Sequence, residues 1–409
     1  MKIIFLAHFA GSPKHGMVYG HYHLAREWVR MEHEVTIVAA SFAHTRFKQP
    51  GASGTVSEEM IDGIRYLWVN CPEYTPSGQV GRVRNILTFV ARTLWGRLPV
   101  TDADLVISSS HYPFAIFPAR KLAKKYGARL VFEVRDIWPL TLIELGGASP
   151  GHPFIRFMQW SEDYAYRMAD KVVSVLPKAD KHMLAHGMNA DKFIYIPNGA
   201  DLDRKSIEPL PDGYLKQIRT LKDKGCFLLG YAGRMGLANA MHDLLDALAI
   251  MDDPNVHAVL LGEGYELENL KEQAVRLGLE ERVHFLPFVP KTQVESFLLE
   301  MDALYVGFLK QSLYRFGTSV TKMNDYMLAA KPVICAIDAE VEGVEEACAG
   351  LLCPAEDSKA IAAAIDRMRR FPAEERQRMG QAGRDWVLAH RDYRILAARF
   401  LARVEEEPF

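Results

Sequence analysis

Short apolar segments alternate with longer amphipathic segments along most of the chain. In the first half, apolar segments predict strands, and helical spacing of apolar residues predicts a helix over 18–31. A second series of apolar segments follows a polar stretch at 201–224, and helical spacing recurs at 320–330, 358–370, 373–390 and 392–405. The predicted strands of the two series are 2–8, 34–40, 64–69, 105–109, 129–133, 171–175 and 193–196, then 226–231, 256–261, 283–285, 303–306 and 332–337. Strands alternating with helices are typical of parallel sheets covered by helices.

This pattern predicts an α/β chain of two Rossmann-like domains that face each other across a cleft, residues 1–200 and 201–391. Ligands of open parallel sheets bind beyond the carboxyl ends of the strands, so we look for the site there. A length of 409 residues agrees with about two domains.

Composition narrows the class of protein. Apolar residues make up 49% of the chain and charged residues 24%, as in globular proteins. The 49 basic and 51 acidic residues nearly balance, which argues against nucleic-acid binding as the main function. The five cysteines are scattered without a C-x-x-C pair, and neither a signal-peptide pattern nor an apolar run of about 18 residues occurs. We expect a cytoplasmic protein, with any membrane contact peripheral and on the inner face.

The segment 314–334 is the first candidate for chemistry. Gly317 predicts a turn, Thr318 and Ser319 suit a helix N-cap, and a buried strand follows the predicted helix. Lys322 and Asp325 lie three residues apart, in the first turns, where free backbone N–H groups suit a diphosphate. An ordinary strand–helix connection with a solvated lysine and aspartate is the alternative.

A second candidate follows the strand 226–231, where Gly233 and Gly236 bracket Arg234. Glycine permits close backbone approach, and a guanidinium can clamp phosphate oxygens with two hydrogen bonds. The alternative is a surface turn. The glycine-containing loop 10–20 does not match G-x-G-x-x-G and by itself predicts little.

Polar residues also end two strands of the first domain. His111 follows the strand 105–109, and Arg135 and Asp136 follow the strand 129–133. Charges at the end of a buried strand are costly unless they are paired or used, so Arg135 and Asp136 are acceptor-site candidates, with a structural ion pair as the alternative. His21 and His23 point to different helix faces and make a poor metal pair, and no D-x-D motif occurs.

Three motifs carry a resemblance to a known family. The residues Gly317, Ser319, Lys322, Asp325, Tyr326, Met327, Lys331 and Pro332 resemble the nucleotide-sugar segment of glycosyltransferase family 4, whose members are retaining enzymes of GT-B fold. The segment 230–236 resembles the same family. The segment 133–139, which reads E-V-R-D-I-W-P, resembles its bacterial O-antigen and capsule branch, which includes L-fucosamine transferase-like proteins. Many members carry two glutamates separated by seven residues. Asp325 stands at the second position, and Gly317 replaces the first.

The resemblance implies roles for the candidate residues. Arg234 and Lys322 would hold the donor diphosphate and stabilise the charge on the leaving group, and Asp325 would bind the ribose. Further donor contacts are implied for Gly16, Met17, Gly233, Gly262, Phe288, Val289, Gly317, Thr318 and Ser319. His111 and Asp136 join Arg234 and Lys322 as catalytic candidates, and the acceptor set is His111, Arg135, Asp136 and Glu162, of which Glu162 is equally explained as structural. The terminal helix, 392–409, would pack back on the first domain.

From these motifs we expect a retaining hexosyl- or N-acetylhexosaminyl-type glycosyltransferase that needs neither cofactor nor metal. The donor would be a nucleotide diphosphate-sugar, with uracil as the expected base and an amino or deoxy sugar. The acceptor would be a glycan linked to polyprenyl diphosphate, in the synthesis of lipopolysaccharide, O-antigen or capsule. Two alternatives stay open: a nucleotide-sugar 2-epimerase of the same fold, and a catalytically silent nucleotide- or glycan-binding protein. The sequence leaves the sugar, acceptor, linkage and oligomeric state open.

The segment 81–98 is a candidate membrane contact. It carries Arg82, Arg84, Arg92 and Arg97 without an acidic residue, beside large apolar side chains. Such a composition is typical of a helix lying at a lipid interface. A helix whose apolar stripe packs on the sheet is the alternative.

Overall fold

Buried parallel strands build two separate sheets in the computed structural model, which describes residues 1–16, 20–75, 79–203 and 207–406. Each sheet belongs to its own unit of the chain. Unit 1 contains Met1–Gly199, Arg315–Ser319 and Tyr393–Phe409, and unit 2 contains Ala200–Tyr314 and Val320–Asp392. The α/β class with parallel sheets in two domains, predicted from the alternating pattern, is confirmed.

The sheet of unit 1 has the strand order β3-β4-β2-β1-β5-β6-β7-β8, and β3 alone is antiparallel to its neighbour. Its strands are β1 (Lys2–Leu6), β2 (Glu34–Ala40), β3 (Val56–Ile61), β4 (Ile64–Val69), β5 (Leu105–Ser110), β6 (Arg129–Val134), β7 (Lys171–Ser174) and β8 (Phe193–Tyr195). Its α-helices are α1 (Gly20–Arg30), α2 (Gln79–Trp95), α3 (Ile116–Tyr126), α4 (Leu140–Glu144), α5 (Pro153–Met168), α6 (Asp180–Ala185) and α14 (Tyr393–Glu405). Strands such as β5 are buried along their whole length because helices cover both faces.

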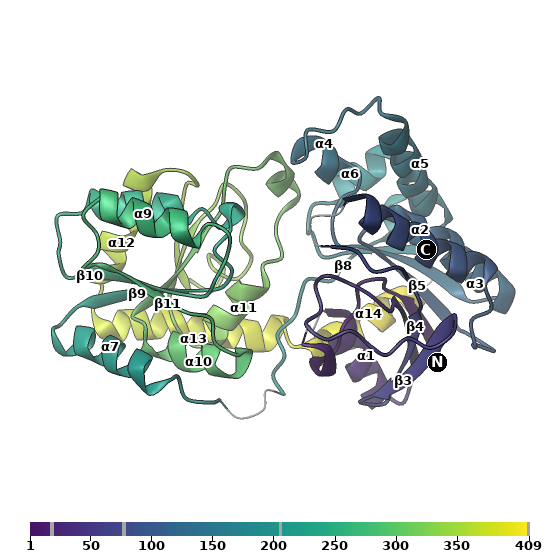
Figure 1. Cartoon of the computed structure of the whole chain (residues 1–409), viewed down its shortest axis with the longest axis horizontal. Coiled ribbons are helices and arrows are strands. Elements are labelled where there is room, and N and C mark those ends of the chain that lie inside the picture. The colour runs from purple at the N-terminus through teal and green to yellow at the C-terminus, as the bar shows by residue number, and fades with distance from the viewer. Residues whose placement is uncertain (17–19, 76–78, 204–206, 407–409) are drawn as a thin grey trace. The chain divides into compact units, whose positions relative to one another are not determined.

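The C-terminal helix α14 packs in unit 1 beside α1 (Figure 1). Trp28 of α1 is fully buried, donates a hydrogen bond from Nε1 to the carbonyl of Ala397 at 3.1 Å, and packs its ring 5.1 Å from that of Phe400. An indole N–H needs such a partner when it is buried. The apolar stripe of α14 thus completes the hydrophobic core of unit 1.

The sheet of unit 2 has the order β11-β10-β9-β12-β13-β14 and is parallel throughout. Figure 1 shows its helices on both faces, with α9 and α12 on one side and α7, α10 and α13 on the other. The strands are β9 (Phe227–Ala232), β10 (Val256–Leu261), β11 (Val283–Leu286), β12 (Ala303–Gly307), β13 (Val333–Ala336) and β14 (Gly350–Cys353). The helices are α7 (Asp212–Asp223), α8 (Met241–Ala249), α9 (Leu267–Arg276), α10 (Lys291–Glu300), α11 (Thr321–Leu328), α12 (Ser358–Arg370) and α13 (Ala373–His390).

Three elements differ from the sequence prediction. The strand β3 was not predicted, because this edge strand carries Glu58 and Glu59 and buries little. The strand β14 was also missed. The stretch predicted as a polar linker contains α7, whose buried residues are Ile218 and Leu221, a stripe too narrow to stand out from the surrounding charges.

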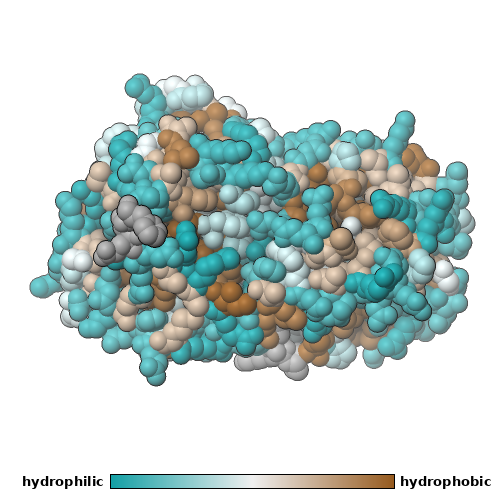
Figure 2. All heavy atoms as spheres, turned by 180° about the vertical axis from the view of Figure 1, so that it is seen from behind, coloured by the Kyte–Doolittle hydropathy of each residue, from teal (hydrophilic) through white to brown (hydrophobic). Residues whose placement is uncertain are grey.

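The surface seen in Figure 2 is largely hydrophilic, with hydrophobic side chains exposed in several patches. A mixed surface is normal for a folded protein. No α-helix in the described part of the chain is long and apolar enough to cross a membrane.

Candidate functional site

Lys322 lies at the centre of a polar cluster in unit 2. Its ammonium, on α11, donates hydrogen bonds to the hydroxyl of Tyr231 and to Oδ1 of Asn239, both at 2.9 Å. The ammonium also lies 4.3 Å from the centre of the Tyr231 ring, within range of a cation–π interaction. Burial lowers the pKa of Lys322 to about 8. An anion placed beside this ammonium would favour its charged form.

Gly233 and Arg234, predicted to act with Lys322, are brought to it by the end of β9. A Cβ added to Gly233, whose φ is 153°, would lie 3.2 Å from Nζ of Lys322. The Arg234 side chain is exposed, and its guanidinium makes no ion pair with any residue that the structure describes. Two cations therefore come from one edge of the sheet, and cations suit a diphosphate.

Two loops at this edge lie in direct backbone contact. Gly233 N–H donates to the carbonyl of Leu261 at 3.0 Å, and Met235 N–H donates to the carbonyl of Glu263 at 2.8 Å. A Cβ on Gly262 would lie 2.0 Å from the carbonyl oxygen of Gly233, so only glycine fits. The Gly262 N–H in turn donates to Leu286 at the end of β11, just before Phe288, which is exposed, and Val289, which is buried.

Asp325, the predicted ribose ligand, is also on α11. Its Oδ2 accepts a hydrogen bond from Nζ of Lys291 at 2.9 Å, and its side chain is mostly buried. Lys291 is the first residue of α10 and is largely exposed. The carboxylate is therefore paired with an exposed cation from a neighbouring helix.

Residues 315–319 are placed in unit 1, apart from the helix that follows them. The prediction that Thr318 or Ser319 caps that helix is wrong: the N-cap of α11 is Val320, which makes no side-chain cap hydrogen bond. The Ser319 hydroxyl accepts instead from the Asn198 backbone N–H at 2.8 Å, because this tertiary partner takes the oxygen that a cap would use.

Backbone conformation and packing both require a glycine at position 317. Its φ is 84°, and a Cβ there would lie 2.4 Å from Cγ of Pro177. A glutamate at this position would be strained and would collide with that ring. The packing explains why the first acidic residue of the family pattern is absent here.

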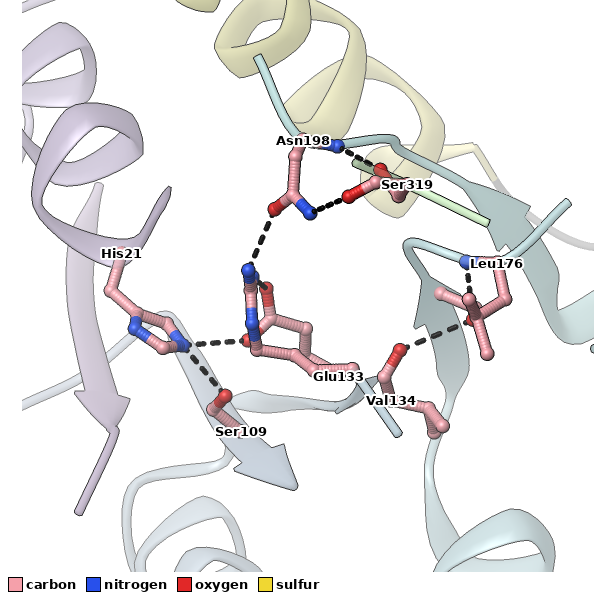
Figure 3. A network of polar contacts seen from close by, with 9 residues as sticks. His21, Ser109, Glu133, Val134, Leu176, Asn198 and Ser319 are labelled. Atoms are coloured by element: carbon pink, nitrogen blue, oxygen red, sulfur yellow. Dashed lines mark hydrogen bonds and ion pairs between the residues drawn. The ribbon is translucent and has the colours of Figure 1, made fainter. Parts of the chain in front are cut away.

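One of the unit 1 candidates, Arg135, belongs to a buried network with Glu133 and His21, drawn in Figure 3. His21 is completely buried, and its Nε2 lies 2.7 Å from Oγ of Ser109 and 3.2 Å from Oε2 of Glu133. Arg135 bonds Oε1 of Glu133 at 3.3 Å and Oδ1 of Asn198 at 2.6 Å. The structural ion pair weighed for Arg135 thus exists, but its partner is Glu133 and not Asp136.

Protonation states within this network follow from burial. Burial lowers the pKa of His21, although Glu133 opposes the shift, so the imidazole is neutral at pH 7. Burial by itself would raise the pKa of Glu133, and His21, Arg135 and the Ser109 hydroxyl together hold it below its usual range. The Glu133 carboxylate therefore stays charged. It acts as the ion-pair partner of Arg135 and not as a proton donor.

His111 lies beside this network, with its ring 5.8 Å from that of His21 and 5.2 Å from that of Phe9. Burial, with the charges of His21 and Arg135, lowers its pKa well below the ordinary value. Asp136 is exposed just beyond the end of β6. Both positions leave their predicted roles open, and His111 would act as a neutral imidazole.

The positions of Glu162 and Gly16 give less support to their predicted roles. Glu162 is buried, and its oxygens accept from Tyr166, His182 and Gln159, which favours the structural alternative. Gly16 ends a short turn, with Phe47 so close that a Cβ would lie 2.8 Å from that ring. Met17 lies outside the described residues.

Sequence reasoning missed Tyr231, Asn239, His21 and Asn198. Tyr231 lies within the glycine segment 230–236 and Asn239 lies three residues beyond it, so the sequence places both near Arg234. The sequence does not show that the Lys322 ammonium bonds to them. Asn198 lies in a Pro-Asn-Gly sequence, where asparagine is expected for a turn, so the sequence gave no sign of a further role. Among the described residues, no group of three or more His, Cys, Asp or Glu side chains is arranged to hold a metal ion.

Two family descriptions match this chain in succession. Residues 15–199 match the glycosyl transferase 4-like domain, and residues 216–386 match the glycosyl transferases group 1. The chain belongs to the GT-B glycosyltransferases. The second match contains the cluster of Arg234 and Lys322, and the first contains the network of His21, Glu133 and Arg135.

Curated relatives agree with the family. The chain is 22% identical to the probable glycosyltransferase WbjE of Pseudomonas aeruginosa over 271 residues, 65% of this chain and 66% of the relative. It is 22% identical over 240 residues to the 2-deoxystreptamine glucosyltransferase of Streptomyces kanamyceticus, 58% of this chain and 59% of the relative. The match therefore spans just under two thirds of these relatives at most.

Solved glycosyltransferase structures share the fold over nearly the full length. Anabaena HepE in complex with UDP superposes with a TM-score of 0.66 at 19% identity, covering 98% of this chain and 99% of the other. WaaG, a glycosyltransferase involved in lipopolysaccharide biosynthesis, superposes with a TM-score of 0.67 at 14% identity, covering 99% and 100%. At these identities the likeness concerns the fold, which is GT-B.

Proposed function

We propose that this protein is a retaining glycosyltransferase that moves a sugar from a UDP-sugar to a lipid-linked glycan acceptor in surface polysaccharide synthesis. The observation that carries the proposal is the cluster of Lys322, Arg234 and Gly233 at the carboxyl edge of the unit 2 sheet. A half-buried ammonium and an exposed guanidinium at the carboxyl edge of a parallel sheet suit a diphosphate.

The chemistry required of this cluster is electrostatic. Departure of the nucleoside diphosphate develops negative charge, which Lys322 and Arg234 would stabilise more strongly in the transition state than in the ground state. Tyr231 and Asn239 hold the ammonium in place beforehand, so little reorganisation is needed. Asp325 would accept hydrogen bonds from the ribose hydroxyls, and no protein base is required for transfer to the front face.

Uracil is the proposed base because HepE, a similar fold, is known with UDP. A place in surface polysaccharide synthesis is supported by the likeness to WaaG, described as an enzyme of lipopolysaccharide biosynthesis. The motif 133–139 supports an amino or deoxy sugar and a polyprenyl diphosphate-linked acceptor. No metal is assigned a role, since the two cations can neutralise the diphosphate.

The acceptor half of the site would lie in unit 1. His111, Arg135 and Asp136 all follow the carboxyl ends of β5 and β6, where acceptors of parallel-sheet domains are expected. Neutral His111 can accept or donate a hydrogen bond to a sugar hydroxyl, and Arg135 is already oriented by Glu133 and Asn198.

Contact with the inner face of the membrane is proposed through α2. One side of this helix is buried, with Asn85 bonded to His8 at 2.8 Å and Phe89 fully enclosed. The opposite side exposes Val80, Leu87 and Trp95, the first and last by 85% and 76%, and α2 carries no acidic residue. The packing alternative thus describes the buried face of α2, and the composition of the outer face, basic and apolar without an acidic residue, supports the proposed contact with anionic lipid.

The deciding experiment is incubation with a panel of nucleotide sugars, with and without polyprenyl diphosphate-linked acceptors. Acceptor-dependent release of nucleoside diphosphate, with the anomeric configuration of the donor kept in the product, is expected. Isomerisation of a sugar nucleotide without acceptor would instead indicate an epimerase. Activity should persist in EDTA, and loss that magnesium restores would contradict the metal-free route.

A further inference from the structure

The five residues Arg315–Ser319 are a separate structural feature, here called the 315–319 segment. The chain leaves unit 2 after Tyr314, joins unit 1 for these residues and returns to unit 2 at Val320. The helix α11 begins at Thr321, directly after this return. Since α11 carries Lys322 and Asp325, whatever holds the 315–319 segment also determines where those side chains begin.

The first part of the segment is anchored at three points. The Arg315 guanidinium bonds both oxygens of Glu144, at 2.6 and 2.8 Å. The carbonyl of Phe316 accepts from the Lys178 N–H at 3.0 Å. Gly317 packs on Pro177 so closely that no side chain fits between them. A bidentate pair and a close backbone approach fix both position and direction.

The last residue of the segment, Ser319, is held by hydrogen bonds to Asn198. The Asn198 backbone N–H donates to Oγ of Ser319, and its Nδ2 donates to the Ser319 carbonyl, both at 2.8 Å. Figure 3 shows the Asn198 side chain between Ser319 and the buried network. Its Oδ1 accepts from Arg135. Arg135 also bonds to Glu133, and Glu133 bonds to His21. The two hydrogen bonds between Asn198 and Ser319, here called the clasp, are thus connected to the core of unit 1.

The start of α11 depends on this clasp because the helix lacks a local one. Its N-cap, Val320, makes no side-chain hydrogen bond to the first turn. A helix start without a capping side chain is less stable and frays more readily. Fraying at Thr321 would displace Lys322 from Tyr231 and Asn239.

We propose that Asn198 is a positioning residue of the donor site, which acts through Ser319 to hold the start of α11 and with it Lys322. The proposal rests on the proposed function, in which Lys322 binds the donor diphosphate. Asn198 touches neither donor nor acceptor in this role. Its effect on transfer passes through two hydrogen bonds to Ser319: Asn198→Ala removes the one from its side chain, and Ser319→Ala removes the one from its backbone N–H. A double-mutant cycle therefore measures whether the two bonds act together.

The cycle compares Asn198→Ala, Ser319→Ala and the double variant by kcat/KM for the UDP-sugar donor. Each single change removes one of the two bonds and is expected to lower kcat/KM about tenfold, and the double variant no further than about twentyfold, because neither bond holds the segment alone. The control is Thr220→Ala, which removes a hydroxyl bonded to the Lys216 carbonyl on exposed α7 and should combine additively with Asn198→Ala. A hundredfold loss in the double variant overturns the proposal.

A second measurement needs no enzyme activity. Limited trypsin digestion of the full chain should cut after Arg315 and Lys322 at least fivefold faster in Asn198→Ala and Ser319→Ala than in wild type, with Thr220→Ala unchanged. Equal rates overturn the clasp. If no donor is turned over even by the wild-type protein, the proposed function fails, and digestion alone decides whether Asn198 holds the segment. Should Asn198→Ala fail to fold, Ser319→Ala and Ser319→Thr carry the digestion comparison.

Discussion

The ammonium of Lys322 donates to the hydroxyl of Tyr231 at 2.9 Å, although the two residues are 91 positions apart in the chain. The contact joins the first turn of α11 to the end of β9, where Arg234 follows. It places two cations from separate sequence motifs at one sheet edge.

Loss of either cation should slow transfer while leaving the fold intact. We expect Lys322→Ala and Arg234→Ala each to cost about 2–4 kcal/mol of transition-state stabilisation, because each removes a charge-assisted contact to the leaving diphosphate. Steady-state kinetics would measure it. The matched control is Lys271→Ala, which removes an exposed lysine paired with Glu268 on α9. Turnover within twofold of wild type in both variants would remove these cations from the site.

The pKa of Lys322 predicts a pH dependence for UDP binding. Burial lowers this pKa to about 8, so the ammonium is fully charged below that pH and becomes neutral as the pH rises through it. Only the charged form pairs with diphosphate, so affinity should be constant up to about pH 7 and fall between pH 8 and 9. Calorimetry across this range would show the decline, and Lys322→Met should abolish it. A decline of equal size in that variant would assign it to another group.

Asp325 is expected to contribute to nucleotide affinity through the ribose. Asp325→Asn keeps the shape of the side chain and loses the charge, so UDP affinity should fall about tenfold, about 1.4 kcal/mol. Lys291→Met serves as the control, because it removes the observed partner of Asp325 and spares the carboxylate. If both variants bind UDP as wild type does, the carboxylate has only the structural role.

Buried neutral histidines predict loss of stability in acid. Burial lowers the pKa of His8 to about 3 and that of His284 to about 4, while the unfolded chain takes up these protons near pH 6.5. The unfolded state therefore binds more protons between these values, and stability falls as the pH drops from about 6.5 towards 4. Calorimetric scans should show a Tm lower by at least about 4 °C at pH 5 than at pH 7. A Tm that rises on acidification would contradict the assignment.

Vesicle sedimentation would test the outer face of α2. Arg82→Ser with Arg84→Ser should weaken binding to anionic vesicles about thirtyfold, since each arginine near such a surface is worth about 1 kcal/mol. Leu87→Ser with Trp95→Ser should weaken it on neutral vesicles as well. Arg92 is left in place because it donates to the carbonyl of Asn70. The control is Ile250→Ser, an exposed apolar residue of unit 2. Sedimentation unchanged by either pair would move the membrane contact elsewhere.

The periodicity of the sequence determined the fold class and most of the strands. Buried parallel strands read as apolar runs because both faces are covered, so β2, β4 and β10 were predicted with their observed ends. The edge strand β3 was missed because one face is open to water and carries charge. Local chemistry also pointed to Gly233, Arg234 and Lys322, since close backbone approach and phosphate pairing need those residue types.

Only the tertiary structure decided which distant residues meet. Local rules made Ser319 a helix cap, but Asn198, 121 positions earlier, takes its hydroxyl. They offered an ion pair of Arg135 with Asp136 only as an alternative, and the structure pairs Arg135 with Glu133 and Asn198 instead. They identified Gly317 only as the replacement of an acidic residue. The structure gives the reason, because a Cβ at this position would collide with Pro177. Hydrogen bonds and steric contacts are set by positions in space, and a single sequence records spacing along the chain alone.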